Sequence, residues 1–378
     1  MRAAWLLGVL ATMPGLVWGQ SSQFGVRGLG FPGRGLNARV IASGGAFGLF
    51  DSESSLNPAA LAGATALTSI FTASGAYRTV ENPAGTASTR DTRFPLLMIL
   101  GPVRQTGTAL GVSYSGYTDR DFSIVSSGTL DLRGGAVGVT DTFTSRGGLS
   151  DLRAAGAYRI RDRWLLGAGL HVITGSNRVE SRRSFEDSTF LSSVQRAEIS
   201  FAGFGVSGGA IRQMGPRFAI AALVRSDGHV NVDRDSTRVA TVDLPYTFGL
   251  GLRWQLAPKL GLATQAIVRT WSAANSDLVV QGGVGANNTF EVALGGEFTP
   301  DLQRPYSRPL RFGGRYGRLP FPLEPGTEAH EYAVSVGSGM RFAQQRAGAD
   351  LGVEHVWRSE GVHSEHGFIF TLGISVRP

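Results

Sequence analysis

Charged and polar residues recur at alternate positions through much of this chain, between large apolar neighbours. Because successive side chains of a β-strand point to opposite faces, these residues share one face of their strands. If that face lines a barrel, arginines and carboxylates pair with and hydrate one another, since buried charge needs compensation. The same face offers a second chemistry, in which arginines hold an anionic head group, with Arg253 and Arg269 as candidates. The inward-facing set comprises Arg153, Arg159, His171, Arg225, Arg253, Gln265, Arg269, Glu291, Glu297, Arg311, Arg315, Asp350, Glu354 and Arg358.

Three histidines near the C-terminus form the one local His/Glu cluster of the sequence. His355 points with its apolar strand neighbours toward the rim, and His363 and His366 have opposite parity, so their side chains diverge. Metal sites need several such ligands converging on one point. We therefore expect no metal site and no cofactor. The cluster comprises His355, His363, His366, Glu354, Glu360 and Glu365.

The sequence gives little support to two other functions, dinucleotide binding and hydrolysis. Gly28, Gly30 and Gly33 satisfy the spacing of a dinucleotide-binding loop, but Pro32 interrupts it and no strand or βαβ unit surrounds it. An outer-membrane hydrolase would need a serine, a histidine and an orienting group together, and a Ser–His pair within hydrogen-bond reach would favour it. The sequence predicts no enzymatic activity.

The stretch from Leu244 to Gln255 shows the kind of element that must position the charged residues. From Tyr246 to Trp254 every second residue is large and apolar, with aromatic residues at both ends and small or polar residues between. A membrane barrel turns such an apolar face toward lipid and places aromatic residues at both interfaces. The pattern recurs from residue 64 to residue 378, which predicts an all-β fold, a transmembrane antiparallel barrel of about 14 strands. The expected strands are approximately 64–79, 91–102, 106–117, 148–160, 163–181, 194–212, 216–232, 237–255, 258–274, 287–299, 308–318, 329–344, 347–360 and 363–377.

The connections support this count, because short turns alternate with longer polar links. Outer-membrane barrels place short turns on the periplasmic side and long loops outside. Residues 120–132 also have strand character, and we assign them to the long third loop. The longer links are 80–90, 118–147, 182–193, 275–286 and 319–328.

The N-terminus and the bulk composition place the protein in the cell envelope. Residues 1–19 combine a positive start, an apolar run and small residues, which predicts a signal peptide. The chain has no cysteine and a net charge of +7, carried by scattered arginines that suit anionic lipid head groups but predict no nucleic-acid binding. The amphipathic strand that ends at Pro378 resembles the signal that hands bacterial barrels to their assembly machinery.

Residues 20–63 lack strand alternation and carry the motifs of a known family. Gly44–Phe47 reads G-G-A-F and Asn57–Ala62 reads N-P-A-A-L-A, including Asn57, Pro58 and Ala59. Placed before such a barrel, they resemble the FadL/TodX type of outer-membrane hydrophobic-compound transporters and their PorV-like relatives. The resemblance implies that residues 20–63 plug the lumen and that apolar ligands bind nearby and leave sideways through the wall. Ligand contacts are then expected at Phe31, Phe47 and Phe50.

The expected function is passive transport of hydrophobic or amphipathic, fatty-acid-like molecules across the outer membrane into the periplasm. The expected partners are outer-membrane lipid and the hydrophobic ligand. The alternative is a barrel that serves protein secretion or surface attachment and transports nothing. A continuous apolar path from plug to wall favours transport, and a sealed wall with large exposed loops favours the alternative.

Overall fold

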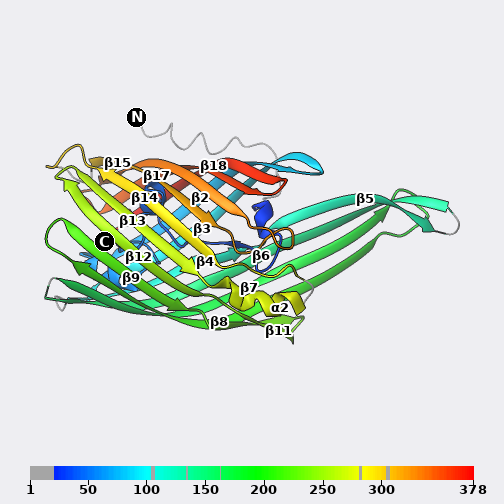
Figure 1. The fold of residues 1–378 in the computed structure, drawn as a ribbon, viewed down its shortest axis with the longest axis horizontal. Coiled ribbons are helices and arrows are strands. Elements are labelled where there is room, and N and C mark those ends of the chain that lie inside the picture. Colours follow the sequence, from blue (N-terminus) through cyan, green and yellow to red (C-terminus); the bar gives the residue numbers. More distant parts are fainter. Residues whose placement is uncertain (1–20, 104–106, 133–134, 162, 281–282, 304–306) are drawn as a thin grey trace.

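The structure is a computed structural model that describes residues 21–103, 107–132, 135–161, 163–280, 283–303 and 307–378. The predicted signal peptide, residues 1–19, lies outside the described residues. The chain forms one closed antiparallel barrel of 14 strands, which confirms the predicted fold class. Figure 1 shows the strands inclined to the long axis, with a ribbon formed by β5 to β8 reaching beyond one end.

The barrel wall closes where its last strand pairs with its first. β18 pairs with β2 in unbroken register from Val376–Ser69 to Ser364–Glu81, so the ladder is continuous along this seam. Two wall strands are interrupted: β9 and β10 form one, and β11 and β12 the next. The wall elements are β2 (Thr68–Asn82), β3 (Gly85–Val103), β4 (Thr108–Asp119), β6 (Gly135–Ile160), β7 (Trp164–Phe185), β8 (Ser193–Gln213), β9 (Phe218–Ser226), β10 (His229–Arg234), β11 (Thr237–Asp243), β12 (Tyr246–Ala257), β13 (Leu260–Arg269), β14 (Thr289–Phe298), β15 (Ser307–Arg318), β16 (His330–Phe342), β17 (Ala347–Glu360) and β18 (His363–Val376).

The outer face of the wall is apolar, as the alternation predicted. Leu250 on β12 is 65% exposed and Phe204 on β8 is 75% exposed. Aromatic residues gather near both ends of the barrel. Phe218 stacks on Trp254 at the short-turn end with centroids 5.7 Å apart, and Tyr316 packs on Tyr332 at the other end. An apolar belt between two aromatic girdles is the surface of a membrane-spanning barrel.

Four of the five long links predicted from the sequence contain regular structure. β2 and β3 continue into the region predicted as the 80–90 loop and turn at residues 83–84. The strand predicted over 258–274 ends at Arg269, because Trp271 turns inward to pack on Phe321 and the chain becomes helical. Two short helices follow there, η3 (Trp271–Ala274) and α2 (Asn275–Val280).

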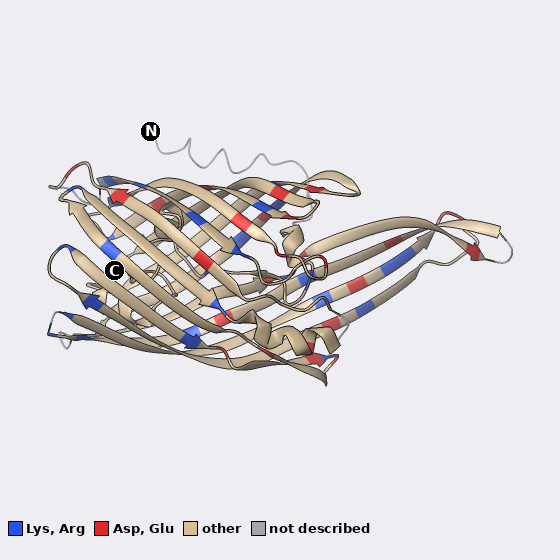
Figure 2. Ribbon diagram, viewed as in Figure 1, with Lys and Arg blue, Asp and Glu red and all other residues tan. Residues whose placement is uncertain are grey.

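The link predicted over 118–147 forms the projecting ribbon together with the outer ends of β7 and β8. β5 (Phe122–Leu132) pairs with the outer half of β6 and lies outside the barrel ring, so its strand-like residues belong to the link over 118–147, as predicted. Opposite charges pair across the ribbon, as in Arg183–Asp141 at 2.6 Å and Arg196–Glu180 at 2.9 Å. Figure 2 shows acidic and basic residues interspersed along it.

Residues 21–63, here called the inner segment, lie inside the barrel. The segment contains η1 (Gln23–Gly25), β1 (Phe31–Pro32), α1 (Ala38–Ala42) and η2 (Pro58–Gly63). η2 contacts β3, β4, β6, β7 and β8, whereas α1 contacts β15 to β18 on the opposite side. The inner segment therefore spans the lumen from wall to wall. No helix among the described residues is long and apolar enough to cross a membrane.

Candidate functional site

The motif Asn57-Pro58-Ala59 docks the inner segment against the wall. The Asn57 side chain accepts a hydrogen bond from Ala59 N at 3.1 Å, which caps η2, and donates to the Leu49 carbonyl at 2.8 Å. Wall glycines make room for it. A Cβ on Gly209 would lie 1.9 Å from Asn57 Oδ1, and one on Gly167 would lie 2.5 Å from Ala59 N. Larger residues at these two wall positions would push the motif out of place.

The opposite docking point, α1, uses the same device. Asn37 caps α1 by accepting from Val40 N at 2.8 Å. A Cβ on Gly313 would lie 2.3 Å from the Ser43 backbone, and one on Gly337 would lie 2.5 Å from Ala42 Cβ. Backbone thus meets backbone on both sides of the lumen, which fixes the height of the inner segment in the barrel.

Beneath the inner segment, at the short-turn end, lies a cavity of about 470 Å³, here called the mouth cavity. It collects three of the five predicted ligand residues, Phe47, Phe50 and Arg253. The Arg253 guanidinium carbon lies 5.5 Å from the centre of the Phe50 ring. Arg253 forms no ion pair with any residue that the structure describes, so its charge is available to an anion.

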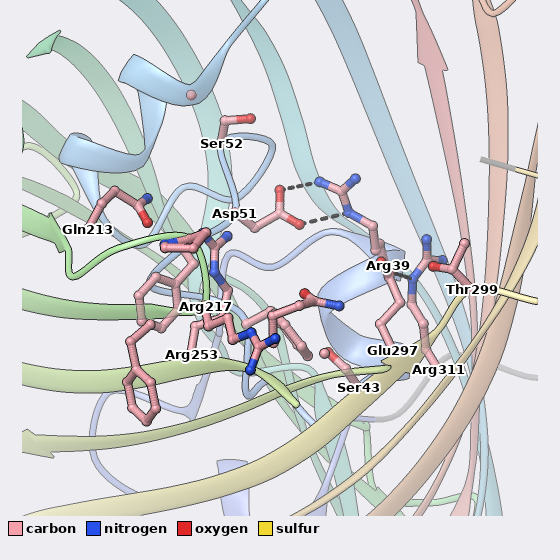
Figure 3. Close-up of a pocket in the computed structure, with 17 residues that line it drawn as sticks. Arg39, Ser43, Asp51, Ser52, Gln213, Arg217, Arg253, Glu297, Thr299 and Arg311 are labelled. Carbon is pink, nitrogen blue, oxygen red and sulfur yellow. Dashed lines mark hydrogen bonds and ion pairs between the residues drawn. The ribbon is translucent and has the colours of Figure 1, made fainter. Parts of the chain in front are cut away.

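Polar groups dominate the rest of the mouth cavity, as Figure 3 shows. Arg39 donates to both Asp51 oxygens, at 2.8 and 2.6 Å. Burial raises the pKa of the Asp51 carboxyl, but the Arg39 charge, the hydrogen bonds from Arg39 and from the Glu53 backbone, and the Arg311 charge together hold the pKa below its usual range. Arg311 pairs with Glu297 at 2.6 Å. The mouth cavity is therefore a charged vestibule with two aromatic rings.

A second cavity of about 160 Å³, here called the seam cavity, lies on the other side of α1. It holds the remaining two predicted ligand residues, Phe31 and Arg269. Apolar groups from wall and inner segment share the lining. They are Phe31, Pro32, Ile41, Pro95, Trp271, Phe290, Leu319 and Ile369.

Ion pairs of both signs surround the seam cavity, as the sequence predicted for the inward-facing set. Arg315 and Arg358 both bind Glu331 at 2.5 Å. The Arg358 guanidinium also lies 4.3 Å from the centre of the Phe31 ring, which holds that ring in place. Arg269, in contrast, makes no ion pair with a described residue. Arg269 is therefore an inward-facing cation of the seam cavity that lacks a paired carboxylate among the described residues.

The wall beside the seam cavity is split between β3 and β4. The two strands pair only from Leu96–Ser115 to Val103–Thr108, although both continue further. Beyond that level β1 takes the vacated edge of β4, pairing Phe31 with Asp119 and Pro32 with Thr118. We call the region between β3 residues 85–95 and β4 residues 116–119 the lateral seam.

Pro95 stands at the point where the two strands separate. Proline has no N–H to donate to a ladder, so it favours an unpaired edge. The β2–β3 register also shifts between Thr72 and Ser74, directly opposite residues 94–95. Across the lateral seam an ion pair remains, with Arg93 Nη2 at 3.0 Å from Asp119 Oδ1. This break in the ladder was not predicted from the sequence, where Pro95 within a strand-like run was the available signal.

The histidines of the C-terminal cluster do not converge. His355 packs on the outer face between the rings of Trp357 and Phe368, with centroids 4.1 and 4.3 Å away. His363 instead faces Glu324 at 3.4 Å. Within the described ranges, three or more His, Cys, Asp or Glu residues nowhere gather in a way that could hold a metal ion.

Comparison with known proteins identifies the fold. No family model and no curated protein sequence matches the chain. A FadL homologue from Pseudomonas aeruginosa matches with a TM-score of 0.64 and 15% identity, over 92% of this chain and 99% of that one. The monoaromatic hydrocarbon channel CymD matches with a TM-score of 0.57 and 14% identity, over 91% and 98%. The toluene transporter TodX of Pseudomonas putida matches with a TM-score of 0.58 and 14% identity, over 91% and 99%.

At these identities the similarity establishes a shared fold. The predicted resemblance to FadL/TodX-type barrels is confirmed at that level, over nearly the whole chain.

Proposed function

We propose that this protein is an outer-membrane channel that passively transports hydrophobic or amphipathic small molecules, including fatty-acid-like compounds, into the periplasm. Secretion would rely on residues 1–19 as a signal peptide, and insertion on recognition of the C-terminal strand by the barrel-assembly machinery. The names of three structural neighbours, a FadL homologue, a hydrocarbon channel and a toluene transporter, support the substrate class.

The lateral seam is the observation that carries the proposal. An apolar molecule in a barrel closed all round would have to leave through the charged mouth cavity. The break beyond Pro95 offers a shorter way, from the seam cavity directly into the surrounding lipid. That route keeps the apolar part of the ligand out of water, which is worth about 25 cal/mol for each Å² of apolar surface.

The unmatched arginines supply the polar half of amphiphile recognition. Arg269 lines the seam cavity beside Phe31, and Arg253 lines the mouth cavity beside Phe50. A carboxylate bound to a guanidinium forms charge-assisted hydrogen bonds, about twice as strong as neutral ones. We therefore assign head-group binding to Arg269 and Arg253, and chain contacts to Phe31, Phe47 and Phe50.

One observation favours the second candidate, an interaction barrel for secretion or surface attachment. The ribbon formed by β5 to β8 projects beyond the membrane-spanning wall and exposes both charges and apolar residues, among them Val125. Such a surface suits a protein partner. The split wall argues against this candidate as the main function, because a barrel that transports nothing gains no evident advantage from an opening.

The test is uptake in cells that lack their own transporters for these compounds. Labelled fatty acid and a labelled neutral hydrocarbon are supplied to cells carrying the barrel or an empty vector, with barrel insertion checked by its altered gel migration before and after boiling. We expect saturable uptake of at least one compound above the vector. If neither enters faster while the folded barrel is present, the interaction-barrel function becomes the better account.

A further inference from the structure

Three polar side chains from consecutive strands meet on the inner face of the wall, outside both cavities described above. They are Asp151 on β6, His171 on β7 and Ser207 on β8, with exposed fractions of 4%, 2% and 7%. The ladder brings them together, because Arg153 faces His171 across β6–β7 and Gly169 faces Ser207 across β7–β8. Asp151 lies two positions from Arg153, and His171 lies two positions from Gly169, in each case on the same face of the strand.

Their hydrogen bonds form a relay with a defined order. His171 Nδ1 lies 2.9 and 3.0 Å from the two Asp151 oxygens. His171 Nε2 lies 2.9 Å from Ser207 Oγ. A hydroxyl bound to one imidazole nitrogen, with a carboxylate on the other, is the arrangement that activates serine for acyl transfer.

A neighbouring arginine fixes the charge of the carboxylate and thereby the tautomer of the histidine. Arg225 Nη1 lies 2.7 Å from Asp151 Oδ2. This ion pair keeps Asp151 ionised, so it accepts the proton on His171 Nδ1. The Nε2 lone pair then faces the Ser207 hydroxyl, which is the orientation a general base requires.

A second arginine beside the relay forms no ion pair with any described residue. Arg153 is 1% exposed, and none of its three guanidinium nitrogens has a hydrogen-bond partner in the described chain. The empty Cβ position of Gly169 lies 2.7 Å from Ser207 Oγ and 3.6 Å from Arg153 Cδ, so the two side chains flank one gap. A buried guanidinium without a partner stabilises negative charge that develops next to it.

A small cavity of the lumen reaches the relay at Asp151, its carboxylate end. Its volume is about 60 Å³, and its lining includes Asp151, Arg225, Leu223 and residues 55–56 of the inner segment. Arg225 is the direct cross-strand neighbour of Ser207. This small volume leaves no room for a long chain beside the relay.

We propose that Ser207, His171 and Asp151 form an acyl-transfer site for small carboxylic esters, an activity that the sequence did not predict. Ser207 Oγ attacks the ester carbonyl carbon while its proton passes to His171 Nε2, and Arg153 stabilises the resulting oxyanion. The C–O bond to the alcohol breaks, and the alcohol leaves with the proton from Nε2. Water then attacks the acyl-serine with His171 as base, which releases the acid and restores Ser207.

The experiment uses the full-length barrel in detergent micelles, with p-nitrophenyl acetate as the probe. Release of p-nitrophenol and acetylation of the protein, seen by intact mass, are measured for the wild type and for Ser207→Ala, His171→Gln and Ser113→Ala. Ser113 is the matched control, because it is 2% exposed, faces Arg153 from β4 and has no bound histidine. Gel migration before and after boiling confirms that each variant is folded.

We expect Ser207→Ala and His171→Gln each to lower the rate about a hundredfold or more, and Ser113→Ala to leave it unchanged. The acetyl group should map to Ser207. A folded wild type that releases p-nitrophenol no faster than Ser207→Ala overturns the proposal, whether or not His171→Gln folds. Acetylation that maps to another residue and persists in Ser207→Ala overturns it equally.

Discussion

The mouth cavity and the seam cavity lie on opposite sides of α1 and differ in what surrounds them. The mouth cavity is three times as large, at about 470 against 160 Å³, and opens among the short turns with Arg39, Arg217, Arg253 and Arg311 in its lining. The seam cavity combines apolar groups of the inner segment and wall with ion-paired arginines and carboxylates, and it adjoins the wall interval where β3 and β4 part.

The comparison shows that the larger cavity need not be the one that binds an apolar ligand. The larger cavity suits water and ions, since its polar groups would have to be desolvated by a hydrocarbon. The smaller one combines an apolar lining, an unmatched arginine and an adjacent exit. The proposed transport therefore places the main ligand contacts in the seam cavity, and gives the mouth cavity a weaker ligand contact in addition to its role in anchoring the inner segment.

The largest expected effect, on ion conductance, comes from removing the inner segment that separates the two cavities. Deleting residues 21–60 while keeping the signal peptide removes α1 and β1 and joins both cavities into one lumen. Because a lumen of this size is otherwise water-accessible, ion conductance in planar bilayers should rise well above that of the intact barrel. A correctly inserted deletion variant that stays closed would mean that another part of the chain occludes the pore.

The aromatic residues of the two cavities should respond differently to substitution. Phe31→Ser removes an apolar contact worth roughly 1.5 to 3 kcal/mol when fully buried, so affinity for a long-chain amphiphile should fall about tenfold or more. Phe47→Ser with Phe50→Ser should mainly loosen the anchoring of the inner segment and raise conductance. Binding titrations and bilayer recordings on the same preparations separate the two. A larger affinity loss in the double variant would move the ligand to the mouth cavity.

Arg269 in the seam cavity and Arg253 in the mouth cavity, which form no ion pair with a described residue, should also differ in their effect on ligand binding. Arg269→Ala should weaken binding of a fatty acid about tenfold and that of its neutral ester much less, because a hydrogen bond to a charged group contributes roughly 1.5 to 3 kcal/mol. Arg253→Ala should have a smaller effect on both ligands. Equal losses for acid and ester in Arg269→Ala would rule out a head-group role.

The smallest effect concerns pH and the mouth cavity alone. Because Arg39 holds the pKa of Asp51 below its usual value, the Asp51 charge stabilises the docked inner segment above that usual value, about 3.9. The contribution is lost as the pH falls through the lower value of the folded protein. Conductance should therefore rise modestly below about pH 4, and Asp51→Asn should show the raised level already at neutral pH. Identical pH profiles for the two proteins would contradict this assignment.

The barrel could be predicted because its wall is a matter of local alternation. Between Tyr246 and Trp254, the alternation of large apolar residues with small or polar ones shows which side chains point outward. The number of strands follows from counting the segments that show this alternation. The early end of β13 could not be predicted in this way. Trp271 turns inward to pack on Tyr117 and Phe321, which are far from it in the sequence, and alternation within the strand does not show such contacts. The five ligand candidates were chosen from residue type and resemblance, and their division between two cavities depends on how the inner segment folds.

The lateral seam and the Ser207 relay could not be predicted, because both depend on register between strands. Pro95 explains why one edge of β3 is unpaired, but it does not show whether the pairing with β2 or the pairing with β4 is the one that ends there. Ser207 is one of many serines on an inward face, and only the β6–β7–β8 register brings it to His171. Pairing of segments far apart in sequence fixes such sites.

The most direct test of the account is to close the lateral seam reversibly. The natural chain has no cysteine, so Arg93→Cys with Asp119→Cys, whose native side chains meet across the seam, can be joined by a short, reducible thiol cross-linker. Ile70→Cys with Ser375→Cys, paired in register on the fully bonded β2–β18 seam, is the matched control. The account predicts that linking the first pair stops saturable uptake, that reduction restores it, and that linking the control pair changes nothing. Uptake that continues at the unlinked rate with the lateral seam fully cross-linked would contradict it.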